Sequence, residues 1–70
     1  MKIMKKLVLN KELYTYANIR KARAVYSELA GIHILPGKTG WTLLFTGCRY
    51  EEEQTIREFE NYLIGLENLK

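Results

Sequence analysis

The order of hydrophobic patterns along the 70 residues constrains the fold more than any other feature of this sequence. Three segments alternate as strands do, and two have the three- and four-residue spacing of helices. In chain order these segments cover residues 5–9, 10–30, 32–35, 41–46 and 51–69. The predicted order is therefore strand, helix, strand, strand, helix. The common split βαβ arrangement adds a fourth strand that covers a sheet edge, and none is predicted after the last helix here.

Each predicted helix has one apolar stripe, which we expect to pack inward. The first helix begins at Asn10 or Thr15, and Gly31 is expected to end it in a left-handed conformation. Glu51 to Glu53 lie where the second helix N-terminus offers partial positive charge. The stripes are Ile19, Ala22, Val25, Tyr26 and Leu29 in the first helix, and Ile56, Phe59, Leu63 and Leu66 in the second, with Tyr62 and Leu69 flanking.

The three strands are predicted to form one antiparallel sheet with spatial order 1-3-2. Residues 32–35 and 41–46 form a hairpin, and the strand-helix-strand connection favours a right-handed crossover. The result is an α+β two-layer sandwich with both helices on one sheet face, in a single domain over residues 1–70. The first strand, which starts at Lys5 or Ile3, keeps an open edge. The helix-covered face is predicted to carry Leu7, Leu9, Ile32, Ile34, Trp41, Leu43 and Phe45.

The opposite sheet face is the first candidate binding site. It is predicted to carry Val8, His33, Leu35, Thr42, Leu44 and Thr46. Scattered exposed aliphatic residues are normal on a protein surface. However, a three-stranded domain of this size gains stability when this face is covered, which favours a protein partner or self-association as a homodimer. The open edge of the first strand offers a second docking mode, although Lys5 and Lys6 oppose strand addition there.

The charge distribution supports an alternative function. Residues 1–40 carry eight basic side chains and two glutamates, a net charge of +6, whereas residues 41–70 carry a net charge of −3. These halves can attract each other between copies, or the basic half can attract nucleic acid. For nucleic-acid binding, the predicted phosphate contacts are Lys5, Lys6, Arg20, Lys21 and Arg23. A solvated helix face is the more usual role of such side chains, so nucleic-acid binding is the alternative hypothesis.

Residues 38–45 can be aligned with the RNA-recognition signature, in which aromatic residues on a sheet face stack on bases. Trp41 and Phe45 share a predicted face with Leu43. Core packing of both aromatic rings is therefore favoured over base stacking.

The sequence offers little for catalysis or metal binding. His33 and Cys48 are the only histidine and cysteine, and aspartate does not occur. Arg49 and the nearby helix N-terminus would favour a Cys48 thiolate, but the neighbouring glutamates oppose it and no group is marked to orient His33. We therefore predict a protein that is not an enzyme and has neither a metal site nor a cofactor.

The predicted location is the cytoplasm. No apolar run approaches the roughly 20 residues needed to cross a bilayer. The N-terminal lysines resemble those of a signal peptide, but only Leu7 to Leu9 follow as an apolar stretch. The lone cysteine, which cannot form an internal disulfide, also fits a reducing compartment.

Scattered positions resemble a known family. They are Leu13 and Tyr14, Asn18 to Ala22, Tyr26, and Tyr50 to Glu53 before the long final helix. In these positions the chain resembles the HxsD-like proteins of the His-Xaa-Ser system, small accessory proteins associated with radical-SAM enzymes. The resemblance implies a role in assembling a peptide-maturation complex, with the iron chemistry in a partner. It implies no catalytic or metal-binding residue in this chain. The predicted function is a small non-catalytic protein-binding or assembly module.

Overall fold

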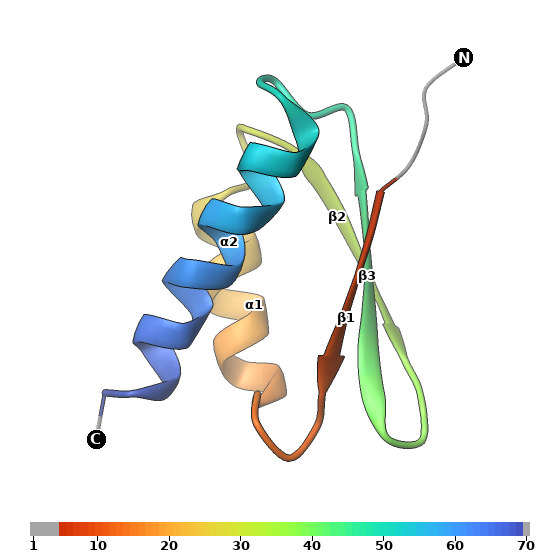
Figure 1. The fold of residues 1–70 in the computed structure, drawn as a ribbon, viewed down its shortest axis with the longest axis vertical. Coiled ribbons are helices and arrows are strands. Elements are labelled where there is room, and N and C mark those ends of the chain that lie inside the picture. Colours follow the sequence, from red (N-terminus) through yellow and green to blue (C-terminus); the bar gives the residue numbers. More distant parts are fainter. Residues whose placement is uncertain (1–4, 70) are drawn as a thin grey trace.

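A computed structural model describes residues 5–69 and shows two helices packed on one face of a three-stranded sheet (Figure 1). Ile3, the alternative start of the first strand, lies outside the described residues. The elements are β1 (Lys5–Asn10), α1 (Tyr16–Val25), β2 (Gly31–Pro36), β3 (Gly40–Thr46) and α2 (Glu52–Glu67). The predicted β-α-β-β-α order is confirmed.

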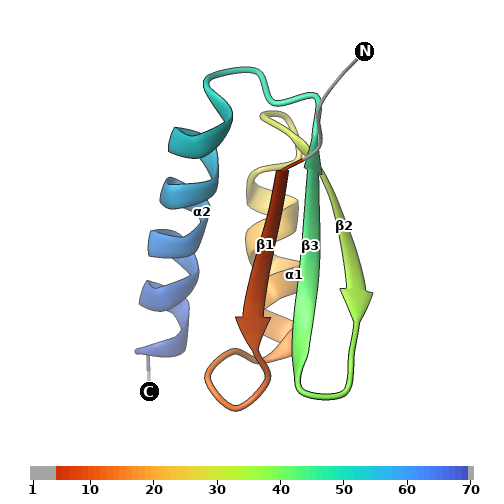
Figure 2. The same cartoon turned by 45° about the vertical axis from the view of Figure 1, so that its right-hand side comes forward.

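The sheet is antiparallel with the order β1-β3-β2, which confirms the predicted topology (Figure 2). β3 is the central strand, and Leu43 lies between Leu7 and Ile34 in the register. The β2–β3 hairpin closes through the Gly37 amide, which donates to the Gly40 carbonyl oxygen at 2.9 Å. Because β3 lies between the other two strands, β1 and β2 form the two edges of the sheet.

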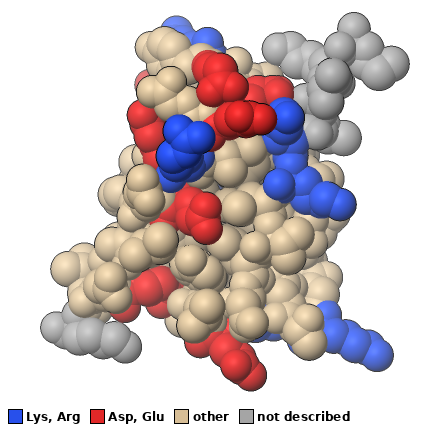
Figure 3. Space-filling view, in the orientation of Figure 1, with Lys and Arg blue, Asp and Glu red and all other residues tan. Residues whose placement is uncertain are grey.

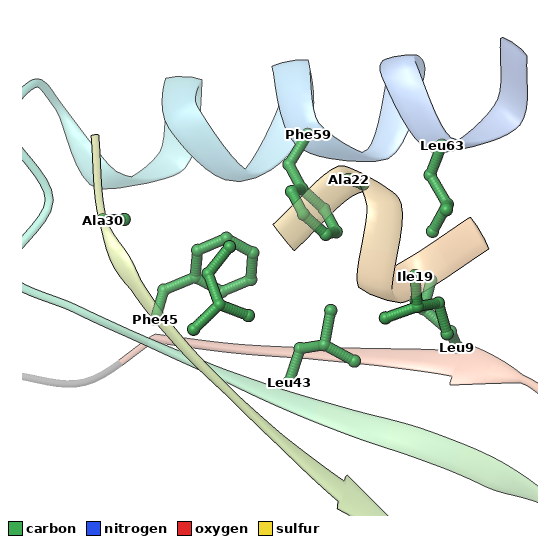
Figure 4. Close-up of a cluster of buried hydrophobic side chains, with 9 residues drawn as sticks. Leu9, Ile19, Ala22, Ala30, Leu43, Phe45, Phe59 and Leu63 are labelled. Carbon is green, nitrogen blue, oxygen red and sulfur yellow. The ribbon is translucent and has the colours of Figure 1, made fainter. Parts of the chain in front are cut away.

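The hydrophobic core lies between the sheet and the two helices (Figure 4). Phe45 of β3 meets Phe59 of α2 edge to face, with ring centroids 5.3 Å apart. Edge-to-face contact is the favoured geometry for such rings. Leu7, Ile34 and Trp41 pack against this core while remaining partly accessible. The buried residues are Leu9, Ile19, Ala22, Ala30, Ile32, Leu43, Phe45, Phe59 and Leu63, and the predicted helix-covered face is therefore correct.

The predicted end of the first helix is wrong. α1 stops at Val25, and the Tyr26 and Ser27 amides close its last turn by donating to the carbonyl oxygens of Ala22 and Ala24, at 3.0 and 3.3 Å. Gly31 already belongs to β2 and does not have a positive φ. The chain uses the residues after Tyr26 as a turn, because it must reverse direction before it enters the sheet. Val25 stands at the margin of the apolar stripe and is 58% exposed, in contrast to its predicted burial.

Both helix N-termini are capped by side chains. Thr15, one of the two predicted starts, accepts a hydrogen bond from the Asn18 amide at 3.4 Å. The Glu51 carboxylate accepts from the amides of Gln54 and Glu53, at 2.7 and 3.2 Å. Each cap satisfies amides that have no partner within the first helical turn. The predicted carboxylate at the start of the second helix thus has a structural role.

Tyr26 connects the turn after α1 to α2. Its ring lies 5.5 Å from that of Phe59 and 6.0 Å from that of Tyr62. Burial raises the pKa of the Tyr26 hydroxyl, and the nearby Glu58 and Tyr62 raise it further. The folded state therefore favours the neutral phenol, and deprotonation opposes folding.

We expect this phenol to make stability depend on pH under alkaline conditions. Because the pKa is raised in the folded state, its contribution is present below about pH 10 and is lost as the pH rises through the folded-state value. Urea unfolding of the wild type and Tyr26→Phe between about pH 9 and 11 tests this, since the variant should lose less stability over this range. Equal losses would show that other groups cause the alkaline dependence.

Candidate functional site: the open sheet face

The open sheet face is the surface of β1, β3 and β2 that faces away from the helices. Alternation places the predicted residues there in cross-strand rows. One row is Val8, Thr42 and Leu35, and the next is Lys6, Leu44 and His33. The structure thus brings five of the six predicted residues into two adjacent rows, and Thr46, paired with Gly31, extends the same face on β3.

Exposure across this face follows the position of each strand. Val8 on β1 is 64% exposed and Leu35 on β2 is 48% exposed. Leu44 on the central strand is half-buried, because neighbouring strands flank it on both sides. Both helices pack on the other face, as Figures 1 and 2 show. Within residues 5–69, no helix or strand covers these aliphatic side chains.

Lys6 belongs to this face but was absent from the predicted set. It lies opposite Leu44 and is exposed. The signal that reveals it is the strand period of two, since Lys6 is two residues before Val8. The face therefore combines three aliphatic side chains, threonine hydroxyls, an imidazole and an ammonium group, with no carboxylate from the described strands.

The open edge of β1 is flanked by charged side chains of α2. The Lys5 ammonium lies 3.8 Å from the Glu53 carboxylate, and the two side chains are 42% and 68% exposed. An exposed ion pair of this kind contributes little to stability. Figure 3 shows basic and acidic atoms side by side where the start of α2 meets the start of β1. The shallow hollow at this edge is lined by Lys5, Lys6, Glu53, Ile56, Arg57 and Glu60.

The five predicted phosphate contacts lie in two groups, one near each edge of the sheet. Arg20, Lys21 and Arg23 of α1 line one groove together with residues of β2. Lys5 and Lys6 belong to β1 at the opposite edge, beside the glutamates of α2. The structure therefore does not assemble the predicted residues into one continuous basic surface.

The side chains of Trp41 and Phe45 make contacts within the protein. Phe45 is fully buried. The Trp41 ring stacks on Tyr16 at 5.2 Å, and the Lys11 ammonium lies 4.7 Å from its centroid. Its indole N–H donates to the Tyr14 carbonyl oxygen at 3.3 Å. Core packing, the favoured interpretation of these aromatics, agrees with their positions.

Cys48 and His33 occupy different environments. Cys48 lies in the connection between β3 and α2 and packs against the core. His33 is exposed on β2, next to Leu44. His33 therefore lies on the open sheet face, whereas Cys48 contacts the core on the helix side of the sheet. Across residues 5–69, no group of three or more His, Cys, Asp or Glu side chains is arranged to hold a metal ion.

Comparisons with protein-family models, curated proteins and solved structures gave no match to this chain. Within the described residues, neither helix is long and apolar enough to cross a membrane.

Proposed function

We propose that this chain is a small non-catalytic protein-binding or assembly module that docks through its open sheet face. One observation supports the proposal above others. Val8, Leu35 and Leu44 share a face that no other described element covers. A small domain buries only a modest apolar area in its own core. Apolar side chains that remain in water on one face therefore favour association with a partner.

The occupant that best fits this face is a second copy of the chain. Leu44 lies on the central strand, so two faces can pack symmetrically around it at the usual sheet-to-sheet spacing of about 10 Å. Like charges oppose this contact only through Lys6, which lies on the edge strand β1, because the described strands place no carboxylate on the face. Each copy carries a net charge of +3, so we expect the contact to depend on the apolar side chains of the face rather than on charge.

The size of the face predicts weak association. A six-residue strand is about 20 Å long and three strands are about 15 Å wide. The flat area of the face is therefore roughly 300 Å², without the additional surface of protruding side chains. Stable interfaces bury about 800 Å² on each partner. We therefore expect a dissociation constant between about 1 μM and 1 mM.

Sedimentation equilibrium between about 10 μM and 1 mM tests this proposal. We expect the wild type to approach a dimer as its concentration rises, and Val8→Lys to remain monomeric. Val25→Lys is the matched control, because Val25 on α1 is 58% exposed and Val8 on β1 is 64% exposed. A wild type that remains monomeric would contradict self-association through this face, as would equal effects of the two substitutions.

We further propose, from the resemblance to HxsD-like proteins, that the assembled module serves a peptide-maturation complex. The resemblance implies that the catalyst would be a radical-SAM enzyme supplied by another chain. Co-purification with a radical-SAM enzyme encoded beside this gene is the expected result. A gene neighbourhood without such an enzyme would remove the support for this role and leave the docking face unaffected.

A further inference from the structure

A groove lies between α1 and the outer edge of β2, and two of its lining residues, Ala30 and Ile32, also belong to the buried core. It is open to solvent and has a volume of about 950 Å³. This is within the size range of ligand sites in proteins. The α1 residues repeat at helical spacing along one side of the helix, and the remaining residues come from the start of β2 and the turn before it. The lining residues are Ala17, Arg20, Lys21, Arg23, Ala24, Ser27, Ala30, Gly31, Ile32 and His33.

The β2 edge differs from the β1 edge in its resistance to strand addition. Among residues 5–69, β2 has a strand partner on one side only, which is β3. Lysines commonly protect an edge, and β1 carries two of them. β2 has the sequence Gly-Ile-His-Ile-Leu-Pro, without lysine or arginine and with proline only at its last position. The outward backbone groups before Pro36 are therefore suited to pairing with another extended chain.

The side chains that line the groove indicate what kind of peptide segment it can bind. Its lining includes the small side chains of Ala17, Ala24 and Ala30. Its charged members are Arg20, Lys21 and Arg23, and the lining contains neither aspartate nor glutamate. Small residues leave room for the methylene groups of an incoming side chain. The guanidinium and ammonium groups would then pair with its carboxylate.

We infer that an extended acidic segment of a partner protein binds in this groove as an added strand beside β2. The backbone of the segment pairs with β2, as in other cases of β-strand addition. Alternate side chains face the helix layer, where they meet Arg20 and Lys21. The remaining side chains lie on the same side as Leu35. The preferred sequence therefore alternates acidic and apolar residues over about six positions, the length of β2.

Nucleic acid fits this groove less well. Single-stranded nucleic acid is bound by aromatic side chains that stack on bases, and the lining includes no Phe, Tyr or Trp. The Tyr16 ring, whose centroid lies 5.8 Å from the guanidinium carbon of Arg20, is engaged with Trp41 at 5.2 Å. The edge of β2 offers backbone donors and acceptors in strand register, which suit a peptide backbone.

The test uses a fluorescein-labelled nonapeptide that alternates valine and glutamate, measured by fluorescence anisotropy against the full chain. Micromolar to submillimolar binding is expected, together with backbone amide shifts along β2. The double substitution Arg20→Glu and Lys21→Glu should weaken binding roughly tenfold or more. Both side chains are exposed, so the fold should tolerate these changes. Lys38→Glu with Arg57→Glu is the matched control, because both residues are exposed and lie outside the groove, and it should change affinity about twofold at most.

Two further probes separate the parts of the inference. A peptide methylated on every backbone nitrogen keeps its side-chain charge but has no backbone N–H to donate from either edge, so it should lose binding. A peptide with glutamine in place of glutamate should also bind weakly. Equal affinity of the methylated peptide, shifts confined to the open sheet face, or tighter binding of single-stranded RNA through Arg20 and Lys21 would overturn the inference. Val8→Lys should leave peptide affinity unchanged, which keeps this test independent of self-association.

Discussion

Phe59→Ala is expected to reduce the free energy of unfolding by about 3–5 kcal/mol, the usual loss when a buried phenylalanine is truncated. Phe59 is fully buried, and its ring contacts Phe45 at 5.3 Å and Tyr26 at 5.5 Å. The substitution therefore removes contacts with the sheet and with the turn after α1 together. A domain of this length has a total stability of about 3–10 kcal/mol, so the variant should be largely unfolded or marginal.

Urea denaturation followed by circular dichroism measures this loss. Ile64→Ala on the same helix is the matched control, because Ile64 is 41% exposed and does not belong to the core. We expect it to cost about 1 kcal/mol or less. Similar losses in the two variants would contradict the assignment of Phe59 as the residue that joins α2 to the sheet.

Gly40→Ala is expected to destabilise the sheet by about 1–3 kcal/mol, the range for overpacking in a tight site. Gly40 pairs with Asn10 at the end of β1. A Cβ atom at Gly40 would lie 2.6 Å from the carbonyl oxygen of Leu9, which is a backbone atom and has little freedom to move. Since Leu9 belongs to the buried core, a shift of β1 also disturbs the packing beneath it.

Gly65→Ala, the same chemical change in α2, is expected to stabilise the protein. Gly65 lies within α2, and a Cβ atom there would meet no heavy atom within 4 Å. Alanine is a better helix former than glycine, so this variant should gain about 0.5–1 kcal/mol. Urea unfolding of both variants, with amide exchange along β1 for Gly40→Ala, checks the pair. A neutral or stabilising Gly40→Ala would show that β1 and β3 separate easily.

The sheet and its order follow from patterns that the sequence displays directly. The alternation of Trp41, Leu43 and Phe45 identifies a strand with one core face, and the short turn before it requires a hairpin. A right-handed crossover then leaves the position between the other two strands for β3. These rules act locally or between neighbouring elements, so they predict the topology without knowledge of side-chain packing.

The end of α1 could not be predicted from hydrophobic patterns. Tyr26 and Leu29 continue the apolar spacing of Ile19 and Ala22, but both lie in a turn. Tyr26 packs against the core, whereas Leu29 is half-buried and lines a hollow beside α2. Helical periodicity does not distinguish a helix from a turn that keeps the same side of the chain buried. The entry into β2 sets where α1 must stop, and it depends on tertiary packing.

The surfaces were predictable to different extents. Alternation placed Val8, Leu35 and Leu44 on one face, and it also places Lys6 beside Val8, although Lys6 was not among the predicted site residues. The groove beside β2 was not predicted, because it depends on how α1 lies over the sheet rather than on any residue pattern. The sequence directed attention to the edge of β1, whereas the uncharged edge is β2.

Intermolecular contacts between methyl groups test the docking face most directly. A mixed sample would combine one copy labelled at the valine and leucine methyls with an unlabelled copy, at about 1 mM total protein so that weak dimers form. The account predicts isotope-filtered nuclear Overhauser contacts at Leu44, Val8 and Leu35, which weaken on dilution and disappear in Val8→Lys. Contacts centred instead on Val25 or Leu13, or none at this concentration, would contradict the open sheet face as the docking surface.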